Sequence, residues 1–211
     1  MRVRVKICGI TSGDDALAAL DAGADALGFM FFKDSPRHLQ LSAARTIIGK
    51  LPPFIAKVGV FVDPSEKLVR EAIEAGIDTL QFHGDEPPDF CRRFSLRTYK
   101  AFRIKDALSL QALRDYDTSA WLLDAFVAGK QGGTGHVFNW ELAVQAKNLG
   151  RPVILAGGLT PENVADAITA VAPYAVDVSS GVESAPGRKD PEKLRTFIER
   201  AHNAAARLAS S

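Results

Sequence analysis

The chain has 211 residues, enough to bury one sizeable core and short for two, so we expect a single catalytic domain over residues 1–211. Its 26 lysines and arginines nearly balance 25 acidic residues, and a formal net charge of +1 argues against nucleic-acid and polybasic membrane binding. Two cysteines are too few for a disulfide framework, and no apolar run could span a membrane or form a signal core, so we expect a cytoplasmic protein.

Short runs of Val, Ile, Leu and Phe alternate with helix-like stretches along the whole chain. Most of these runs are almost continuously apolar, as buried parallel strands require. The expected strands are residues 2–7, 26–30, 56–61, 79–82, 98–102, 121–124, 153–156 and 175–178. Eight strand–helix units in about 200 residues predict a single (β/α)8 TIM barrel of the α/β class, with a doubly wound open sheet as the alternative.

Several expected helices begin with a residue that can cap the N-terminus. The expected caps are Ser42 before residues 43–50, Asp63 before Pro64 and Glu66, Thr160 before Pro161 and residues 162–171, and Asp190 before residues 192–207. Residues 20–29 and 73–82 also resemble each other, with a glycine between a helix end and a strand in both copies. This internal echo indicates repeated helix–strand units rather than a particular chemistry.

The first expected strand leads to Cys8, which is followed by a glycine. The chemistry of a TIM barrel is located where strands lead into the following loops, so Cys8 is a candidate base. Lys6 lies two residues earlier and shares its face, and an ammonium there would lower the pKa of the thiol. The alternative is that Cys8 is a small buried apolar residue. Cys91, within an expected helix, is interpreted as a core residue.

The sixth expected strand ends at Asp124, a candidate general acid or base whose alternative role is to brace the next loop. That loop contains Gly133, Thr134 and Gly135, whose exposed backbone N–H groups resemble an anion cradle. A glycine-rich loop alone is weak evidence, because such loops are common.

Two further glycine-rich turns strengthen the prediction of a phosphate site. The seventh strand leads to Gly157 and Gly158, and the eighth leads to Ser179, Ser180 and Gly181. Barrel enzymes often bind phosphate with the loops after these two strands and a short helix N-terminus. Neutral backbone and hydroxyl donors suit a chain that has little net charge.

Three other polar residues are expected at the same mouth. Arg37 follows a proline after the second strand and suits a bidentate grip on a substrate carboxylate, although arginines on loops are usually solvated. His83 follows the fourth strand and either contacts substrate or makes a structural hydrogen bond. Asp177 shares a strand face with Ser179 and either binds substrate hydroxyls or braces the barrel. The histidines are dispersed without ligand spacing, so no metal site is expected.

With these residues in place, the chain resembles phosphoribosylanthranilate isomerase along nearly its whole length. Each matching segment alone is moderate evidence, but all of them in order are highly specific. The segments are Lys6-Ile7-Cys8-Gly9-Ile10-Thr11, Gly28-Phe29-Met30-Phe31 with Ser35-Pro36-Arg37, Val58-Gly59-Val60-Phe61-Val62, Gln81-Phe82-His83-Gly84-Asp85-Glu86, Leu123-Asp124 with Gly132-Gly133-Thr134-Gly135, Leu155-Ala156-Gly157-Gly158-Leu159, and Asp177-Val178-Ser179-Ser180-Gly181-Val182-Glu183 with Pro186-Gly187-Arg188-Lys189-Asp190.

The resemblance implies an Amadori rearrangement of a phosphoribosyl anthranilate in tryptophan biosynthesis, without metal or organic cofactor. It implies that Asp124 is the general acid that opens the ribose ring and Cys8 the general base that removes the C2 proton. It further implies that Arg37 holds the anthranilate carboxylate. The loops at Gly133-Thr134-Gly135, Gly157-Gly158 and Ser180-Gly181 are then expected to hold the phosphate.

Other readings stay open from the sequence alone. Another phosphosugar barrel, of the pentose-phosphate epimerase or indole-glycerol-phosphate synthase type, would use paired acids, a metal, or lysine and glutamate at the mouth. A non-catalytic sensor of a phosphate ligand would not need to keep both Cys8 and Asp124. The expected partner is a small phosphosugar substrate, and a monomer is expected rather than a homodimer.

Overall fold

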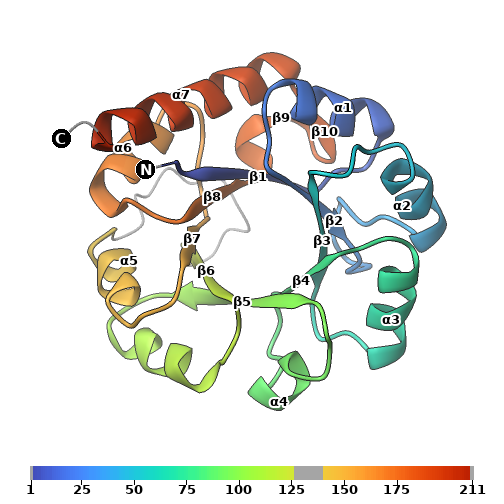
Figure 1. Ribbon diagram of the computed structural model, residues 1–211, viewed down its shortest axis with the longest axis horizontal. Helices are drawn as coiled ribbons and strands as arrows, with labels where there is room; N and C mark the ends of the chain where they lie inside the picture. Colours follow the sequence, from blue (N-terminus) through green and yellow to red (C-terminus); the bar gives the residue numbers. More distant parts are fainter. Residues whose placement is uncertain (1, 126–139, 210–211) are drawn as a thin grey trace.

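The computed structural model describes residues 2–125 and 140–209, and eight parallel strands within them close into a barrel. Each strand pairs with the next in chain order, and β8 pairs with β1, so the ring has no free edge. Figure 1 looks down this ring and shows helices around its outside. The predicted (β/α)8 TIM barrel is therefore confirmed, and the alternative of an open sheet is wrong.

The strands lie close to their predicted positions. Four of them have the predicted bounds, and the others differ by no more than two residues at either end. They are β1 (Arg4–Cys8), β2 (Ala26–Met30), β3 (Ala56–Phe61), β4 (Thr79–Phe82), β5 (Arg97–Ile104), β6 (Ala120–Ala125), β7 (Val153–Leu155) and β8 (Ala175–Val178). A short antiparallel hairpin follows the barrel strands and is formed by β9 (Glu183–Ala185) and β10 (Arg188–Lys189).

Helical segments separate the barrel strands, and a short and a long one follow β8. They are α1 (Gly13–Asp21), α2 (Leu41–Ile48), α3 (Glu66–Glu74), α4 (Pro88–Cys91), the 3-10 helix η1 (Leu108–Asp115), α5 (Trp140–Lys147), α6 (Val164–Val171), the 3-10 turn η2 (Ser180–Val182) and α7 (Pro191–Ala209). Within the described part of the chain, no helix has the length and apolar character needed to cross a membrane.

Of the two aspartates predicted to cap helices, Asp190 does so and Asp63 does not, because the Asp63 carboxylate has another hydrogen-bond partner. Asp190 caps α7 as predicted, because its Oδ1 accepts hydrogen bonds from the backbone N–H groups of Glu192 and Lys193. The prediction for Asp63 is wrong, since Ser65 caps α3 instead. Asp63 has a left-handed φ of 45°, and its Oδ1 accepts a bond from the backbone of Asp85 in the next β–α loop. Its carboxylate therefore joins two loops rather than starting a helix.

The predicted starts of α2 and α6 are also wrong. Helix α2 begins at Leu41, before Ser42, and its N-cap residue makes no side-chain hydrogen bond. Helix α6 begins at Val164, because Thr160 and Asn163 first close a separate turn. The Thr160 backbone N–H donates to Asn163 Oδ1 at 2.8 Å, and Thr160 Oγ1 accepts from the backbone of Glu162.

The internal echo corresponds to two matching helix ends. Gly23 after α1 and Gly76 after α3 have φ values of 100° and 109°, which favour glycine. In each copy the next strand begins three residues after the glycine, at Ala26 and Thr79. The repeat is therefore a structural device that ends a helix and starts a strand.

Strand alternation divides the buried side chains into two sets. One cluster lies between strands and helices and includes Ile7, Leu123 and Val176. The second cluster fills the barrel interior and includes Cys8 and Leu122. Because side chains alternate along a strand, residues two positions from an interior residue also point inward. The carboxyl ends of β1 and β6 thus direct Cys8 and Asp124 into the barrel mouth.

Candidate active site

Lys6, Cys8 and Asp177 form a buried group at the carboxyl ends of β1 and β8. Lys6 is aligned with Asp177 in the strand register, and its Nζ lies 2.9 Å from Asp177 Oδ1, with side chains 4% and 8% exposed. The neighbouring position on β2 is Gly28, where a Cβ would lie 2.9 Å from Cys8 Sγ and 3.1 Å from Lys6 Nζ. The absent side chain at Gly28 therefore makes room for the thiol and the ammonium to lie side by side.

Burial dominates the ionisation of Cys8. It raises the pKa of the thiol, while the Lys6 ammonium lowers it and the Asp177 carboxylate raises it again. Lys6 acts in the predicted direction, but the prediction of a lowered thiol pKa is wrong for the net shift. Asp177 accounts for part of the difference, because it pairs with the same ammonium and holds the pKa of Lys6 above its ordinary value despite burial.

Asp124 ends a chain of hydrogen-bonded side chains that joins the neighbouring strands β4, β5 and β6. The Tyr99 hydroxyl donates to Gln81 Oε1 at 3.0 Å, which directs the Gln81 amide nitrogen toward His83 Nδ1 at 2.9 Å. With Nδ1 accepting that bond, the proton of a neutral imidazole is on Nε2, which lies 3.3 Å from Asp124 Oδ2. Gln81 and Tyr99 thus select the tautomer of His83 that donates to Asp124.

Arg37 reaches the mouth across Gly9, the residue after Cys8. A Cβ on Gly9 would lie 2.5 Å from Arg37 Cδ, and Gly9 has a φ of +77°, so a larger residue is excluded for two reasons. Arg37 Nε and Nη2 donate to the two carboxylate oxygens of Glu183 at 2.7 and 2.6 Å. The guanidinium is therefore already held by one carboxylate, and only 20% of its side chain is exposed.

The loops after β7 and β8 meet closely and leave backbone donors open. Gly157 and Gly158 have φ values of 81° and 68°, and a Cβ on Gly181 would lie 2.0 Å from the Leu159 carbonyl oxygen. Within the described ranges, the N–H groups of Gly157, Gly158 and Gly181 donate to no protein acceptor. Unpaired N–H groups on left-handed and tightly packed glycine backbone are typical of anion-binding loops.

The predicted site residues that the structure describes thus gather at one end of the barrel. Ser179 and Ser180 lie where β8 leads into η2, beside the loop that carries Gly158. The predicted phosphate residues Gly133, Thr134 and Gly135 lie outside the described residues. Cys91 is buried at the end of α4, on the outer side of the barrel, in agreement with its interpretation as a core residue.

Sequence reasoning missed Gln81, Tyr99, Glu183 and Lys189 as members of the site. A signal existed for Gln81, because it lies two residues before His83 and so shares its inward face. Glu183 belongs to a matching segment, but nothing in the sequence indicates that it reaches Arg37, which is 146 positions away.

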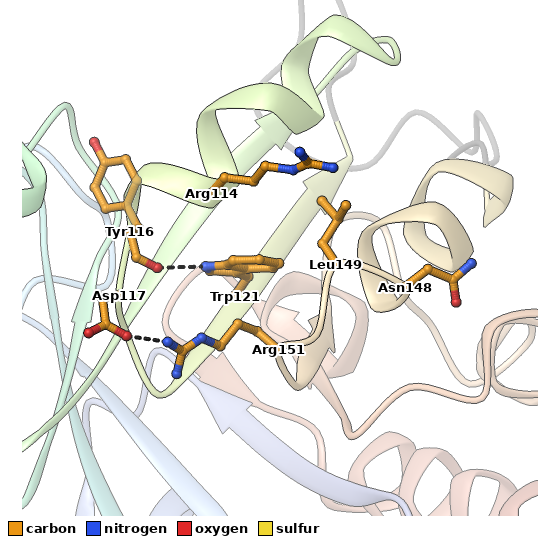
Figure 2. Close-up of a pocket in the computed structure, with 7 residues that line it drawn as sticks. All are labelled: Arg114, Tyr116, Asp117, Trp121, Asn148, Leu149 and Arg151. Atoms are coloured by element: carbon orange, nitrogen blue, oxygen red, sulfur yellow. Dashed lines mark hydrogen bonds and ion pairs between the residues drawn. The ribbon is translucent and has the colours of Figure 1, made fainter.

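A hollow of about 520 Å³ lies at the opposite end of the barrel (Figure 2). Trp121 forms part of its lining, and its ring N–H donates to the Tyr116 carbonyl at 3.2 Å. An ion pair between Arg151 and Asp117 lines it further, at the amino ends of β6 and β7. It contains none of the predicted site residues, so the mouth near Cys8 and Asp124 is the better candidate for the chemistry.

Comparisons with known proteins agree over nearly the whole chain. Residues 5–200 match the family described as N-(5'phosphoribosyl)anthranilate (PRA) isomerase. The N-(5'-phosphoribosyl)anthranilate isomerase of Geobacter metallireducens is 58% identical over 94% of this chain and 98% of its own. The crystal structure of phosphoribosyl anthranilate isomerase from Thermotoga maritima has 40% identity and a TM-score of 0.89, covering 95% of this chain and 99% of its own. A crystal structure of such an isomerase in complex with reduced 1-(o-carboxyphenylamino)-1-deoxyribulose 5-phosphate has 39% identity and a TM-score of 0.85, with the same two coverages.

Proposed function

The chain belongs to the N-(5'-phosphoribosyl)anthranilate isomerase family, and we propose that Cys8 and Asp124 are the general base and general acid of its reaction. The protein is an isomerase of tryptophan biosynthesis that converts N-(5-phosphoribosyl)anthranilate to 1-(2-carboxyphenylamino)-1-deoxyribulose 5-phosphate by an Amadori rearrangement. This assignment replaces the two alternatives from the sequence, another phosphosugar barrel and a non-catalytic sensor.

The proposed acid acts first. Asp124 donates a proton to the furanose ring oxygen, the bond from C1 to that oxygen breaks, and the lone pair of the anthranilate nitrogen forms an iminium. The observation that carries this role is that Asp124 lies near the carboxyl end of β6, with its carboxylate directed into the mouth and one oxygen held by His83. Since His83 Nε2 donates to Oδ2, the other oxygen is the one that remains to carry the proton to substrate.

The proposed base acts second. The Cys8 thiolate removes the proton from C2, the electron pair moves to form an enolamine, and the positive charge on nitrogen is neutralised. The enolamine then tautomerises to the ketone. Because the substrate's own nitrogen stabilises the cation, no step requires a metal or an organic cofactor, and we propose that neither is used. Turnover of Cys8 and Asp124 variants, followed through the loss of substrate fluorescence, tests these two roles.

The remaining predicted residues are proposed to hold the substrate. The phosphate is assigned to Gly157, Gly158 and the turn 179–181, together with residues 133–135. The open N–H groups and the close approach of the two loops support this assignment. Lys6, His83 and Asp177 are proposed to contact the sugar, because they surround the thiol or bond the acid.

We propose that Arg37 binds the anthranilate carboxylate, and Arg37→Ala tests this. The variant is expected to raise KM by about tenfold to a hundredfold and to change kcat much less, because a charge-assisted contact to a non-reacting group binds substrate and transition state alike. Steady-state kinetics measures both constants. An unchanged KM would refute the carboxylate role.

We also propose a single domain and a cytoplasmic, monomeric protein without nucleic-acid or membrane partners. Both cysteines are free and buried, as expected in a reducing compartment. Few large apolar side chains among the described residues are exposed, and of these Phe54, which is fully exposed, is the feature that most favours a dimer. Light scattering should give the monomer mass of 22.7 kDa, and twice that mass would contradict the proposal.

A further inference from the structure

Glu183 holds Arg37 by one edge of its guanidinium. The two bonds, 2.7 Å from Nε and 2.6 Å from Nη2, take both carboxylate oxygens, and the Glu183 side chain is only 5% exposed. An arginine has five N–H donors, so three remain for another acceptor. A second carboxylate can therefore approach the Nη1 side of the guanidinium while Glu183 keeps its place.

Lys189 supplies a second cation to the same carboxylate. Its Nζ is fully buried and lies 2.9 Å from Glu183 Oε1 and 3.1 Å from the Ser179 carbonyl oxygen. The cluster therefore contains two cations and one anion. A pair of Arg37 and Glu183 alone would be neutral, whereas the cluster with Lys189 carries one surplus positive charge.

Hydrogen bonds to three neighbouring segments hold β9 and β10, the strands that carry Glu183 and Lys189. The Thr11 hydroxyl donates to the carbonyl of Gly187 at the hairpin turn, and Lys193 Nζ on α7 donates to the Glu183 carbonyl at 2.9 Å. At the other end, Lys189 reaches the carbonyl of Ser179 in the proposed phosphate loop. The hairpin β9–β10 thus connects the loop proposed for phosphate with the arginine proposed for carboxylate.

From this geometry we propose that Glu183 is a positioning residue that fixes Arg37 for the substrate carboxylate, and that Lys189 preserves the positive charge this requires. The inference rests on the proposed role of Arg37. An arginine that is already held loses little side-chain freedom when the ligand arrives. The substrate carboxylate then brings the charge of the cluster to zero, whereas a neutral pair would attract it weakly.

The test compares two ligands in calorimetric binding. One is reduced 1-(o-carboxyphenylamino)-1-deoxyribulose 5-phosphate, and the other is the same compound without its carboxyl group. For the protein with Glu183→Asp, which keeps the charge but shortens the side chain, we expect the preference for the carboxylated ligand to fall about tenfold. Glu183→Gln also releases Arg37 but leaves one more uncompensated positive charge, so it should lower the preference by a smaller factor. KM should rise by a similar factor while kcat changes less than about threefold.

Three controls separate this inference from its premise. Glu66→Gln, on the outer helix α3, removes a carboxylate that pairs with Arg70 and Arg93, and it should leave the preference unchanged. Arg37→Ala should abolish the preference, and Arg37→Ala combined with Glu183→Gln should lower it no further. Equal weakening of both ligands by the Glu183 variants, or no change, would overturn the positioning role. A preference that survives Arg37→Ala would instead refute the proposed function of Arg37.

Discussion

Replacing Cys8 with alanine is expected to lower kcat by a factor of about 10² to 10⁴ and to leave KM within a few fold. The reason is that the variant keeps the proposed phosphate and carboxylate contacts but has no group to remove the C2 proton. Steady-state turnover, followed by the fluorescence of the substrate, measures both constants. A Cys8→Ala enzyme with near-normal kcat would show that another group is the base.

Cys91→Ala provides the matched control for this prediction. Cys91 is also a free, buried cysteine, but it lies on α4 outside the barrel. Its replacement removes the same atoms without touching the mouth, so kcat should stay within about twofold of the parent enzyme.

The same background measures the ionisation of Cys8. Since burial raises the pKa of the thiol above its ordinary value, alkylation by iodoacetamide in Cys91→Ala should be slow at neutral pH and accelerate only under alkaline conditions. The sign follows from the reactive form, because the thiolate fraction falls as the pH drops below the pKa. Fast alkylation at pH 6 would mean that Lys6 outweighs burial.

The second large effect is expected for Asp124→Asn, which should lower kcat by a factor of about 10² to 10⁴. Asparagine has nearly the same shape and can still accept a hydrogen bond from His83 through its amide oxygen, but it cannot deliver a proton to the ring oxygen. The loss should therefore appear in kcat with KM nearly unchanged. Single-turnover experiments would place the loss in the chemical step rather than in product release.

Asp117→Asn is the corresponding control, because Asp117 pairs with Arg151 at the opposite end of the barrel. It makes the same chemical change far from the mouth and should leave kcat unchanged. If Asp124→Asn were as active as Asp117→Asn, the acid would have to be a different residue.

Much of the fold and of the proposed site could be predicted because strand periodicity and strand order are both local signals. Continuous apolar runs identified the eight strands, and in a parallel barrel all their carboxyl ends lie on one face. Polar residues at those ends, such as Cys8, Asp124 and Asp177, therefore had to come together. Helix starts were less predictable, because Asp63 had two possible partners and its bond to the Asp85 loop prevailed.

The contacts between site residues could not be predicted, because they depend on distances between side chains on different strands and loops. The bond between Gln81 and Tyr99 crosses from β4 to β5, and Glu183 reaches Arg37 over 146 positions. The net shift of the Cys8 pKa is a balance of burial against two opposite charges, and burial was not visible in the sequence. The sequence indicated that Lys6 lowers the pKa of Cys8, but not that burial raises it by more.

The most direct test of the central claim is a crystal structure of this protein with reduced 1-(o-carboxyphenylamino)-1-deoxyribulose 5-phosphate. We expect Cys8 Sγ within about 3.5 Å of C2, and an Asp124 oxygen within hydrogen-bond distance of O4, the oxygen that closes the ring in the substrate. A complex in which the thiol faces away from C2, or in which Asp124 does not reach O4, would contradict the account.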